Sequence, residues 1–245
     1  MKAVVLAGGV RSGTEIPGSG LPRALWPFPH AALIEQVLHF LRNQNIHDIA
    51  VCANGKTRMI EAHLSAADPL GATLHYSEDI RPRGPAGCLR DLCPWLGDEP
   101  FVAIQAAASY NFDLSSMIDH HHRGGAAVTV GARTCNDDAD ALEPAGVYII
   151  DPDTLENIAP VGYQDFQEQC SQRVIARGQL ALLSQVDAAA AVSRPVQLDD
   201  EAEAGGTGEG AHPAPAPVRI DGTAPVPPPA SVGSTAPGRT GSGAG

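Results

Sequence analysis

The residues best suited to chemistry lie in a glycine-rich loop near the amino terminus. Gly8 and Gly9 follow a short apolar run, and Arg23 comes after a segment rich in glycine and proline, within LAGGVRSGTEIPGSGLPRALWPF (6–28). Glycines let a backbone approach a phosphate closely, and a nearby cation neutralises its charge. The glycine spacing matches neither the Walker pattern nor GxGxxG, so the loop alone indicates phosphate binding only weakly.

The elements that must position this loop alternate between strands and helices. Short apolar runs predict strands at 2–7, 48–53, 72–77, 101–107, 126–133 and 145–151. Helical spacing of apolar residues predicts helices at 30–44, 58–64, 86–96, 113–122, 153–158 and 163–176. The alternation predicts an α/β fold with a doubly wound, mostly parallel, Rossmann-like sheet. Ligands of such sheets bind at the carboxyl ends of the strands, which favours one crevice lined by loops 8–23, 78–87 and 106–112.

Charge and composition narrow the class of protein. The formal net charge is −12, from 28 acidic and 16 basic residues, and only Lys2 and Lys56 are lysines. A negative field disfavours nucleic acid and anionic membranes as partners. No stretch approaches the ~18 apolar residues of a membrane helix, and the apolar run at the amino terminus is too short for a signal peptide. We therefore expect a cytoplasmic protein, in which the five cysteines are reduced.

The composition changes after about residue 198. Residues 205–245 contain 10 Gly and 8 Pro in 41 positions, which is typical of low complexity. From Ile220 the tail also reads in hexads, with Ile220, Val226 and Val232 at the first position. This phase favours a single coil of left-handed β-helix over a plain linker, although one coil cannot bury its own face. We predict a domain at 1–198, a linker at 199–219, and a hexapeptide-like or disordered tail at 220–245.

Four sequence elements, in order over residues 1–180 or so, carry a family resemblance. LAGG…PRAL-x-PFPHAALIEQVL, RGPAGCLRDL, EPFVAIQAAASYNFDLSSMIDHH and EPAGVYIIDPDTLENI resemble the signature elements of sugar-1-phosphate nucleotidyltransferases, the nucleotide-sugar pyrophosphorylases. The first element matches LAGGxGTRLxPLTxxxPKxLxP from Ala7 to Pro22 without a gap. A hexad tail is also common in that family. The resemblance implies the nucleotide-diphospho-sugar transferase fold.

The resemblance also implies a reaction, in which a sugar phosphate attacks the α-phosphorus of a nucleoside triphosphate and pyrophosphate leaves. Catalysis then depends on positioned cations. Members use the arginine of GTR, the lysine of PK, and Mg²⁺ held by the aspartate of GD. Here the arginine position is Gly13, the lysine position is Arg23, and the GD positions are Ala106 and Ala107. Only 15 residues separate Thr129 from Ala145, where members carry a longer excursion with a sugar-phosphate clamp.

These departures favour a degenerate, non-catalytic member that binds a nucleotide or nucleotide sugar weakly, or serves as a regulatory module. The resemblance places nucleotide contacts at Leu6, Ala7, Gly8, Gly9, Arg23, Gly84 and Gly87. Glu78 follows the third predicted strand at the predicted crevice, where a contact with a ribose hydroxyl or base and a solvated turn both stay open. No metal or cofactor is expected for that module. The main alternative is an active enzyme with a rebuilt site, in which Arg11, Arg23 and another carboxylate take part and Mg²⁺ is required. A remnant that folds and binds nothing also stays open. A homo-oligomer and an assembly with an active homologue both stay open as partners.

Two smaller signals complete the site reading. Asp113 precedes the helix predicted from Leu114, and aspartate is a preferred N-cap residue. His120, His121 and His122 are adjacent, so their side chains point in different directions and favour a solvated helix end over a metal site.

Because one hexad coil cannot bury its own face, residues 199–245 should make few contacts with the core. Hydrogen exchange on the full-length monomer tests this expectation, and we expect fast exchange throughout the tail. Slow exchange across 220–237 would contradict it.

Overall fold

The computed structural model describes most of the predicted α/β domain, comprising residues 1–8, 20–28, 31–66, 71–80, 83–135, 138–164, 180–184 and 188–189. The predicted linker and tail at 199–245 lie outside the described residues, as do Gly9, Arg11 and Gly13 in the glycine-rich loop.

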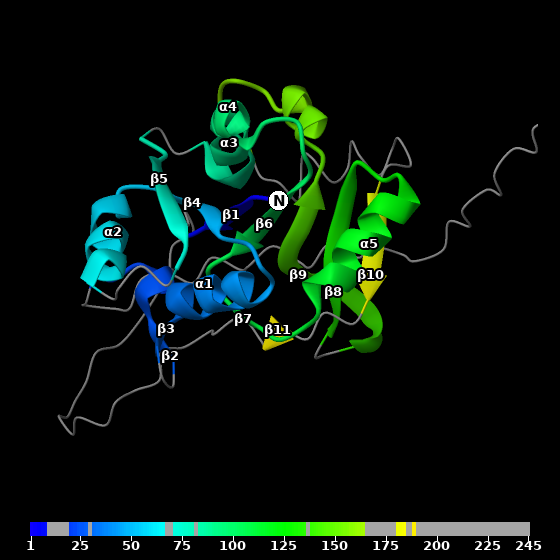
Figure 1. The fold of residues 1–245 in the computed structure, drawn as a ribbon, viewed down its shortest axis with the longest axis horizontal. Coiled ribbons are helices and arrows are strands. Elements are labelled where there is room, and N and C mark those ends of the chain that lie inside the picture. The colour runs from blue at the N-terminus through cyan, green and yellow to red at the C-terminus, as the bar shows by residue number, and fades with distance from the viewer. Residues whose placement is uncertain are drawn as a thin grey trace, which may run out of the picture.

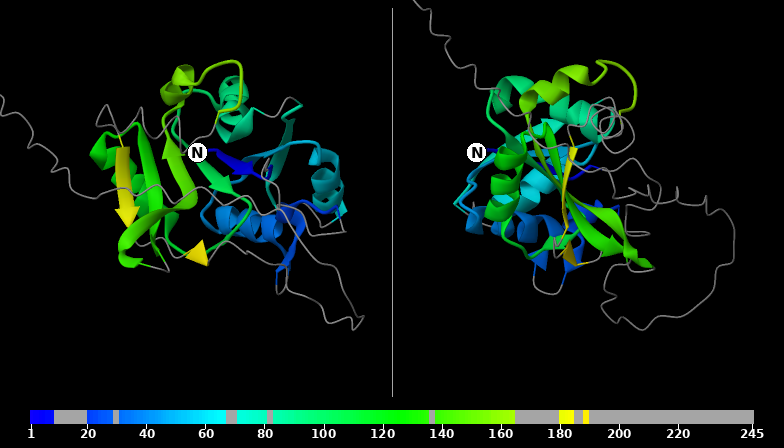
Figure 2. Two further views of the ribbon diagram at one scale, coloured as in Figure 1. Left: turned by 180° about the vertical axis from the view of Figure 1, so that it is seen from behind. Right: turned by 90° about the vertical axis from the view of Figure 1, so that its right-hand side faces the viewer.

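A seven-stranded sheet forms the centre of the molecule. Its order is β10-β8-β9-β6-β1-β4-β5 (Figure 1), and the view from behind shows the same order reversed (Figure 2, left). Its strands are β1 (Ala3–Leu6), β4 (Asp48–Ala53), β5 (Thr73–Glu78), β6 (Phe101–Gln105), β8 (Val128–Cys135), β9 (Asp138–Ile150) and β10 (Leu180–Ser184). Strands β5, β4, β1 and β6 are parallel, β9 runs antiparallel between β6 and β8, and β10 is parallel to β8. The predicted mostly parallel α/β sheet is confirmed.

Helices pack on both faces of this sheet. The helical elements are η1 (Arg23–Leu25), α1 (Leu33–Asn43), α2 (Thr57–Ala66), α3 (Gly84–Asp91), α4 (Cys93–Leu96), α5 (Leu114–Gly124) and η2 (Pro152–Asn157). Apolar side chains of α1, α2 and α5 share one buried cluster with Ala3 and Val5, whereas those of α3, α4 and η2 share another with Val4 and Leu6. Alternate residues of a strand point to opposite faces, so β1 contributes to both clusters.

Short two-residue strands complete the described structure. Strand β2 (Pro27–Phe28) pairs antiparallel with β3 (Ala31–Ala32), and β7 (Ser109–Tyr110) with β11 (Ala188–Ala189). Within the described part of the chain, no helix combines the length and apolar character of a membrane span.

Several observed elements differ from the predicted ones, and strand β10 has no predicted counterpart. The helix predicted at 86–96 is two helices, α3 and α4, with Pro94 in the first turn of α4; proline lacks the N–H that a continuous helix would use. Strand β9 starts at Asp138 rather than 145, because it pairs with β8 from Cys135↔Asp138 to Val128↔Ile150. Tyr163 and Gln164 are not helical, and the rest of the helix predicted at 163–176 lies outside the described residues.

Helix α5 confirms one prediction and corrects another. Asp113 is its N-cap, and the carboxylate accepts a hydrogen bond from the Ser115 N–H at 3.0 Å. Hydrogen bonds from the Ser115 and Ser116 hydroxyls, and then the one from the Ser115 N–H, lower the pKa of Asp113. The expectation of a solvated histidine end was wrong for His121, which is only 3% exposed. Its ring nitrogens lie 3.0 Å from Thr129 Oγ1 and 3.2 Å from Asp151 Oδ1, so it joins α5 to β8 and to the residue before η2.

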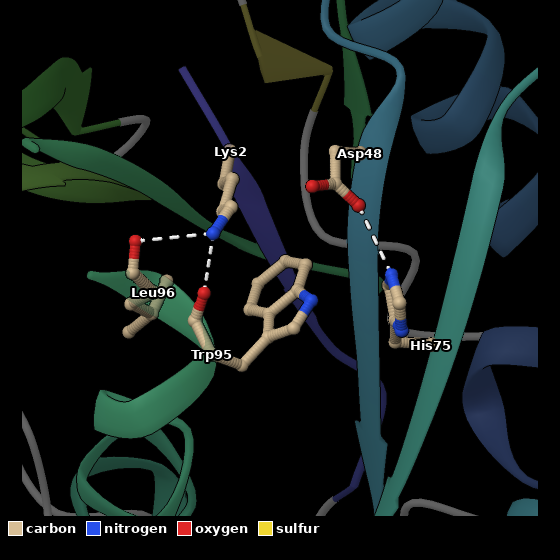
Figure 3. A network of polar contacts seen from close by, with 5 residues as sticks. All are labelled: Lys2, Asp48, His75, Trp95 and Leu96. Carbon is tan, nitrogen blue, oxygen red and sulfur yellow. Dashed lines mark hydrogen bonds and ion pairs between the residues drawn. The ribbon is translucent and has the colours of Figure 1, made fainter.

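Lys2 is an anchor at the amino end of the parallel strands (Figure 3). Its ammonium donates to the carbonyl oxygens of Trp95 and Leu96, at the end of α4, and lies 4.9 Å from the centre of the Trp95 ring. Carbonyls in the last turn of a helix have no partner within the helix, so a cation there satisfies them. The Trp95 ring also contacts His75, which is 3.1 Å from Asp48 Oδ1.

Replacing Lys2 should therefore lower the free energy of unfolding. We expect Lys2→Gln to lose about 2 kcal/mol, since it removes charge-assisted hydrogen bonds and a cation–π contact. Urea unfolding measures the change, with Arg58→Gln as a control that removes one exposed cation from α2. Equal stabilities for the two variants would show that the Lys2 contacts contribute nothing.

Candidate functional site

A cavity of about 250 Å³ opens at the carboxyl ends of three neighbouring strands. Leu6 and Ala7 line it from the end of β1, Asn54 and Lys56 from the loop after β4, and Ala106 and Ala107 from the loop after β6; Gly8, Pro22, Arg23 and Ala24 complete its wall. This is the edge at which open α/β sheets bind ligands. We call these ten residues the strand-end pocket.

Of the predicted contact residues, the structure places four in this pocket: Leu6, Ala7, Gly8 and Arg23. Gly8 also meets a packing constraint. A Cβ built on it would lie 3.1 Å from Asn54 Oδ1 and 3.2 Å from Asn54 N. The absence of a side chain at Gly8 therefore lets the first loop lie against the loop after β4.

Arg23 is the first residue of the short helix η1. The Leu25 N–H donates to Pro22 O at 2.8 Å, and the Trp26 N–H to Arg23 O at 3.0 Å. Ala24, Leu25 and Trp26 are buried, and the guanidinium carbon lies 5.7 Å from the centre of the Trp26 ring. Burial lowers the pKa of Arg23, but arginine still carries its charge at neutral pH. The pocket therefore contains a cation with a constrained backbone.

Lys56 and Asn54 are pocket residues that the sequence reasoning missed. Both lie just before α2, in a loop that was read only as the connection after a strand. The Lys56 ammonium donates a hydrogen bond to Gly20 O at 3.2 Å, and this bond joins the loop after β4 to the end of the first loop. The only available signal was that Lys56 follows a strand parallel to the first one, whose carboxyl end shares the same edge of the sheet.

The loop after β6 carries the two alanines at the GD positions. Ala106 is 2% exposed, and its N–H donates to Leu6 O at 3.0 Å, which extends the pairing of β6 with β1. The Tyr110 hydroxyl closes the loop from the other side, bonding to Gln105 O at 3.1 Å and Gly146 O at 3.3 Å. Burial raises the pKa of Tyr110, so its hydroxyl stays protonated and can donate. The loop is thus well supported, although alanine supplies no functional group.

The pocket lining does not fit Mg²⁺. Among its described residues it offers one side-chain amide oxygen, from Asn54, and no carboxylate. Mg²⁺ requires near-octahedral oxygen ligands, usually with at least one carboxylate. Elsewhere among the described residues, no group of three or more His, Cys, Asp or Glu is arranged to hold a metal ion.

The other predicted contacts lie outside the pocket wall. Glu78 supports it, because Oε1 accepts a hydrogen bond from the Gly55 N–H at 2.9 Å. Gly84 packs against Gln164, whose carbonyl oxygen would lie 2.5 Å from an added Cβ, and Gly87 packs against Arg83. A nucleotide contact at these three residues stays a prediction, since it requires a ligand that extends beyond the cavity. Gly9 lies outside the described residues.

The sheet order and the strand-end pocket define a doubly wound α/β protein whose pocket lies at the usual ligand-binding edge of the sheet. A family model described as nucleotidyl transferase matches residues 2–141, more than half of the sequence. The chain therefore belongs to the nucleotidyl transferase family, as its sequence elements predicted.

Solved structures share this fold at low sequence identity. A Bacillus anthracis protein assigned as a glucose-1-phosphate thymidylyltransferase, in complex with sucrose, is similar with a TM-score of 0.65 and 16% identity over 80% of this chain and 92% of that one. HddC from Yersinia pseudotuberculosis is similar with a TM-score of 0.65 and 14% identity over 79% and 94%, both alone and complexed with GMP-PN. At these identities the likeness establishes the shared fold.

Gly146 should be sensitive to substitution, because it has two reasons to be glycine. Its φ is +83°, and an added Cβ would lie 3.0 Å from the Tyr110 hydroxyl and 3.1 Å from Gln105 Oε1. We expect Gly146→Ala to cost about 2–3 kcal/mol, since it adds left-handed strain and displaces a hydrogen bond.

The matched control for this substitution is Gly125→Ala. Gly125 has a φ of +59° with nothing within 4 Å of an added Cβ, so it should show only the backbone cost of about 1 kcal/mol. Urea unfolding compares the two variants. Equal losses would mean that the contact with Tyr110 does not constrain the loop after β6.

Proposed function

We propose that this protein is a non-catalytic nucleotidyltransferase-like module that binds the phosphate groups of a nucleotide or nucleotide sugar. The observation that carries the proposal is the composition of the strand-end pocket. Arg23 and Lys56 supply two cations, and Ala107 stands where the family resemblance implies a metal-binding aspartate. Such a wall can attract a phosphate but offers no carboxylate for the metal that transfer would use.

The hairpin of β8 and β9 supports the loss of catalysis. Only residues 136 and 137 separate the two strands, and Cys135 pairs with Asp138. The resemblance implies a longer excursion in this region, carrying the groups that hold the sugar phosphate. A bound sugar phosphate would therefore lack that clamp, and positioning is a major part of phosphoryl-transfer catalysis.

The expected loss of catalytic rate also favours binding over turnover. Removing one preorganised donor from an active site costs about 10²–10³ in rate. Three such groups are at issue: the metal ligand, the arginine that the family carries where this chain has Gly13, and the sugar-phosphate clamp. Their combined loss would remove most of a rate enhancement of at least ~10⁶.

Binding is tested by a thermal-shift screen of nucleoside triphosphates and nucleotide sugars, each with Mg²⁺ and with EDTA. A ligand at ~100 times its Kd should stabilise the protein by about 2.7 kcal/mol. We expect a shift that does not require Mg²⁺. If no nucleotide or nucleotide sugar shifts the transition, the binding proposal fails.

Catalysis is tested by pyrophosphate release from triphosphate and sugar-1-phosphate pairs across a range of Mg²⁺ concentrations. We expect none above background. The double variant Gly13→Arg/Ala107→Asp should recover little activity, because the β8–β9 hairpin still lacks the clamp. Robust Mg²⁺-dependent release by the unmodified protein would instead favour an active enzyme with a rebuilt site, using Arg11 and Arg23.

A further inference from the structure

Strand β5 forms one edge of the central sheet (Figure 1). It pairs with β4 in a parallel register that runs from Asp48↔Thr73 to Ala53↔Glu78. Among the strands of the described residues, β4 is the only one that pairs with it. The outer side of an edge strand presents unpaired N–H and C=O groups, which are a template for pairing with another chain.

Alternate residues of β5 direct their backbone groups away from β4. The Thr73 N–H donates to His47 O at 2.7 Å, and the Asp79 N–H donates to Ala53 O at 2.8 Å. The odd-numbered residues therefore face β4, because the backbone groups of successive residues in a strand point to opposite sides. Within the described part of the chain, nothing bonds to the outward-facing groups. These groups belong to Leu74, Tyr76 and Glu78.

The sequence of β5 lacks the features that keep many edge strands from pairing. Natural edge strands often carry lysine or proline, or contain a β-bulge. Residues 73–78 read TLHYSE, and their register with β4 has no shift. Two residues after the strand, Ile80 presents a large apolar side chain that is 84% exposed. The edge can therefore accept a further strand and is apolar at one end.

This edge is complementary to itself in one antiparallel register. When Tyr76 lies opposite Tyr76 of a second copy, Leu74 of each copy lies opposite Glu78 of the other. All three outward-facing residues are then matched, and each matched pair exchanges both backbone hydrogen bonds. The same register places Ile80 opposite Ala72. Glu78 faces an apolar residue instead of another acid, which matters in a chain of charge −12 because directly opposed like charges destabilise a strand pair.

We propose that a second copy of this chain pairs antiparallel with β5, so that two seven-stranded sheets join edge to edge about a two-fold axis at Tyr76. Such an interface is isologous, and each of its contacts occurs twice. The pairing of one short strand gives an interface at the small end of the size range, so the dimer is weak and reversible. The proposal is independent of the proposed function, because no residue of β5 lines the strand-end pocket.

Sedimentation equilibrium of the full chain tests for the dimer, over protein concentrations from about 1 μM to about 1 mM. Ile80→Lys should raise the dissociation constant of the dimer about tenfold, because it replaces an apolar contact with a charge in both copies. The matched control is Val161→Lys, which adds the same charge at a position that is 78% exposed and lies outside β5. The control should change the constant by less than about threefold.

Residue-resolved hydrogen exchange by NMR locates the interface without any substitution. The outward-facing amides of Leu74, Tyr76 and Glu78 should become protected as the protein concentration rises. The amides that face β4 should be protected at every concentration; they belong to Thr73, His75 and Ser77.

Four outcomes would overturn the proposal. The first is a chain that stays monomeric over the whole concentration range. The second is a dimer in which the outward-facing amides still exchange fast, which would place the interface elsewhere. The third is an equal effect of the two lysine variants on association. The fourth is protection that appears only when a foreign strand peptide is added, which would assign the edge to a different partner.

Discussion

Parallel pairing of β1 with both β4 and β6 is the constraint on which the rest of this structure depends. Ala3, Val4 and Val5 are fully buried, because helices cover both faces of the sheet at this strand. A strand buried on both faces must be apolar throughout and cannot slip in register without losing its neighbours. The register aligns Leu6 with Cys52 and with Gln105, so the next residues of all three strands emerge side by side.

This convergence explains why the scaffold and the chemistry of the site can change independently. The backbone of the loop after β6 is held by the Ala106 N–H bond to Leu6 and by the Tyr110 hydroxyl, neither of which involves a side chain at 106 or 107. Alanine at these positions therefore costs the fold little. Arg23 and Lys56 line the same pocket from two other segments, the short helix η1 and the loop after β4.

Much of the scaffold was predictable because its signals are local. Apolar runs located the strands near their observed positions, and the 3.6-residue spacing located α1 and α2. Asp113 was recognised as an N-cap because the capping interaction spans only two or three residues. Arg23 and the first loop were found through a motif that stays contiguous in the sequence. Prolines and glycines at known distances from strand ends carry that signal without any three-dimensional information.

The features that the sequence analysis missed or misjudged share one physical cause. Each of them depends on contacts with residues that are distant in the sequence. In the sequence, Lys56 is simply a residue that precedes a helix. Only the pairing of β4 with β1 brings it to the edge of the sheet where the pocket lies. His121 is buried because it reaches Thr129 and Asp151, and no local pattern encodes those contacts. The extent of β9 follows from antiparallel pairing with β8, and its place between β6 and β8 follows from the sheet order.

The sequence by itself therefore determined the class of fold and the family, since residue identity and spacing are sufficient for both. Only the tertiary structure decided which side chains share the pocket. Parallel strands bring their carboxyl ends to one edge irrespective of their separation along the chain, so Lys56 and Arg23 line one pocket there. Gly84 and Gly87 instead pack against Gln164 and Arg83. The charge of the site is a property of that edge and of no single segment of the sequence.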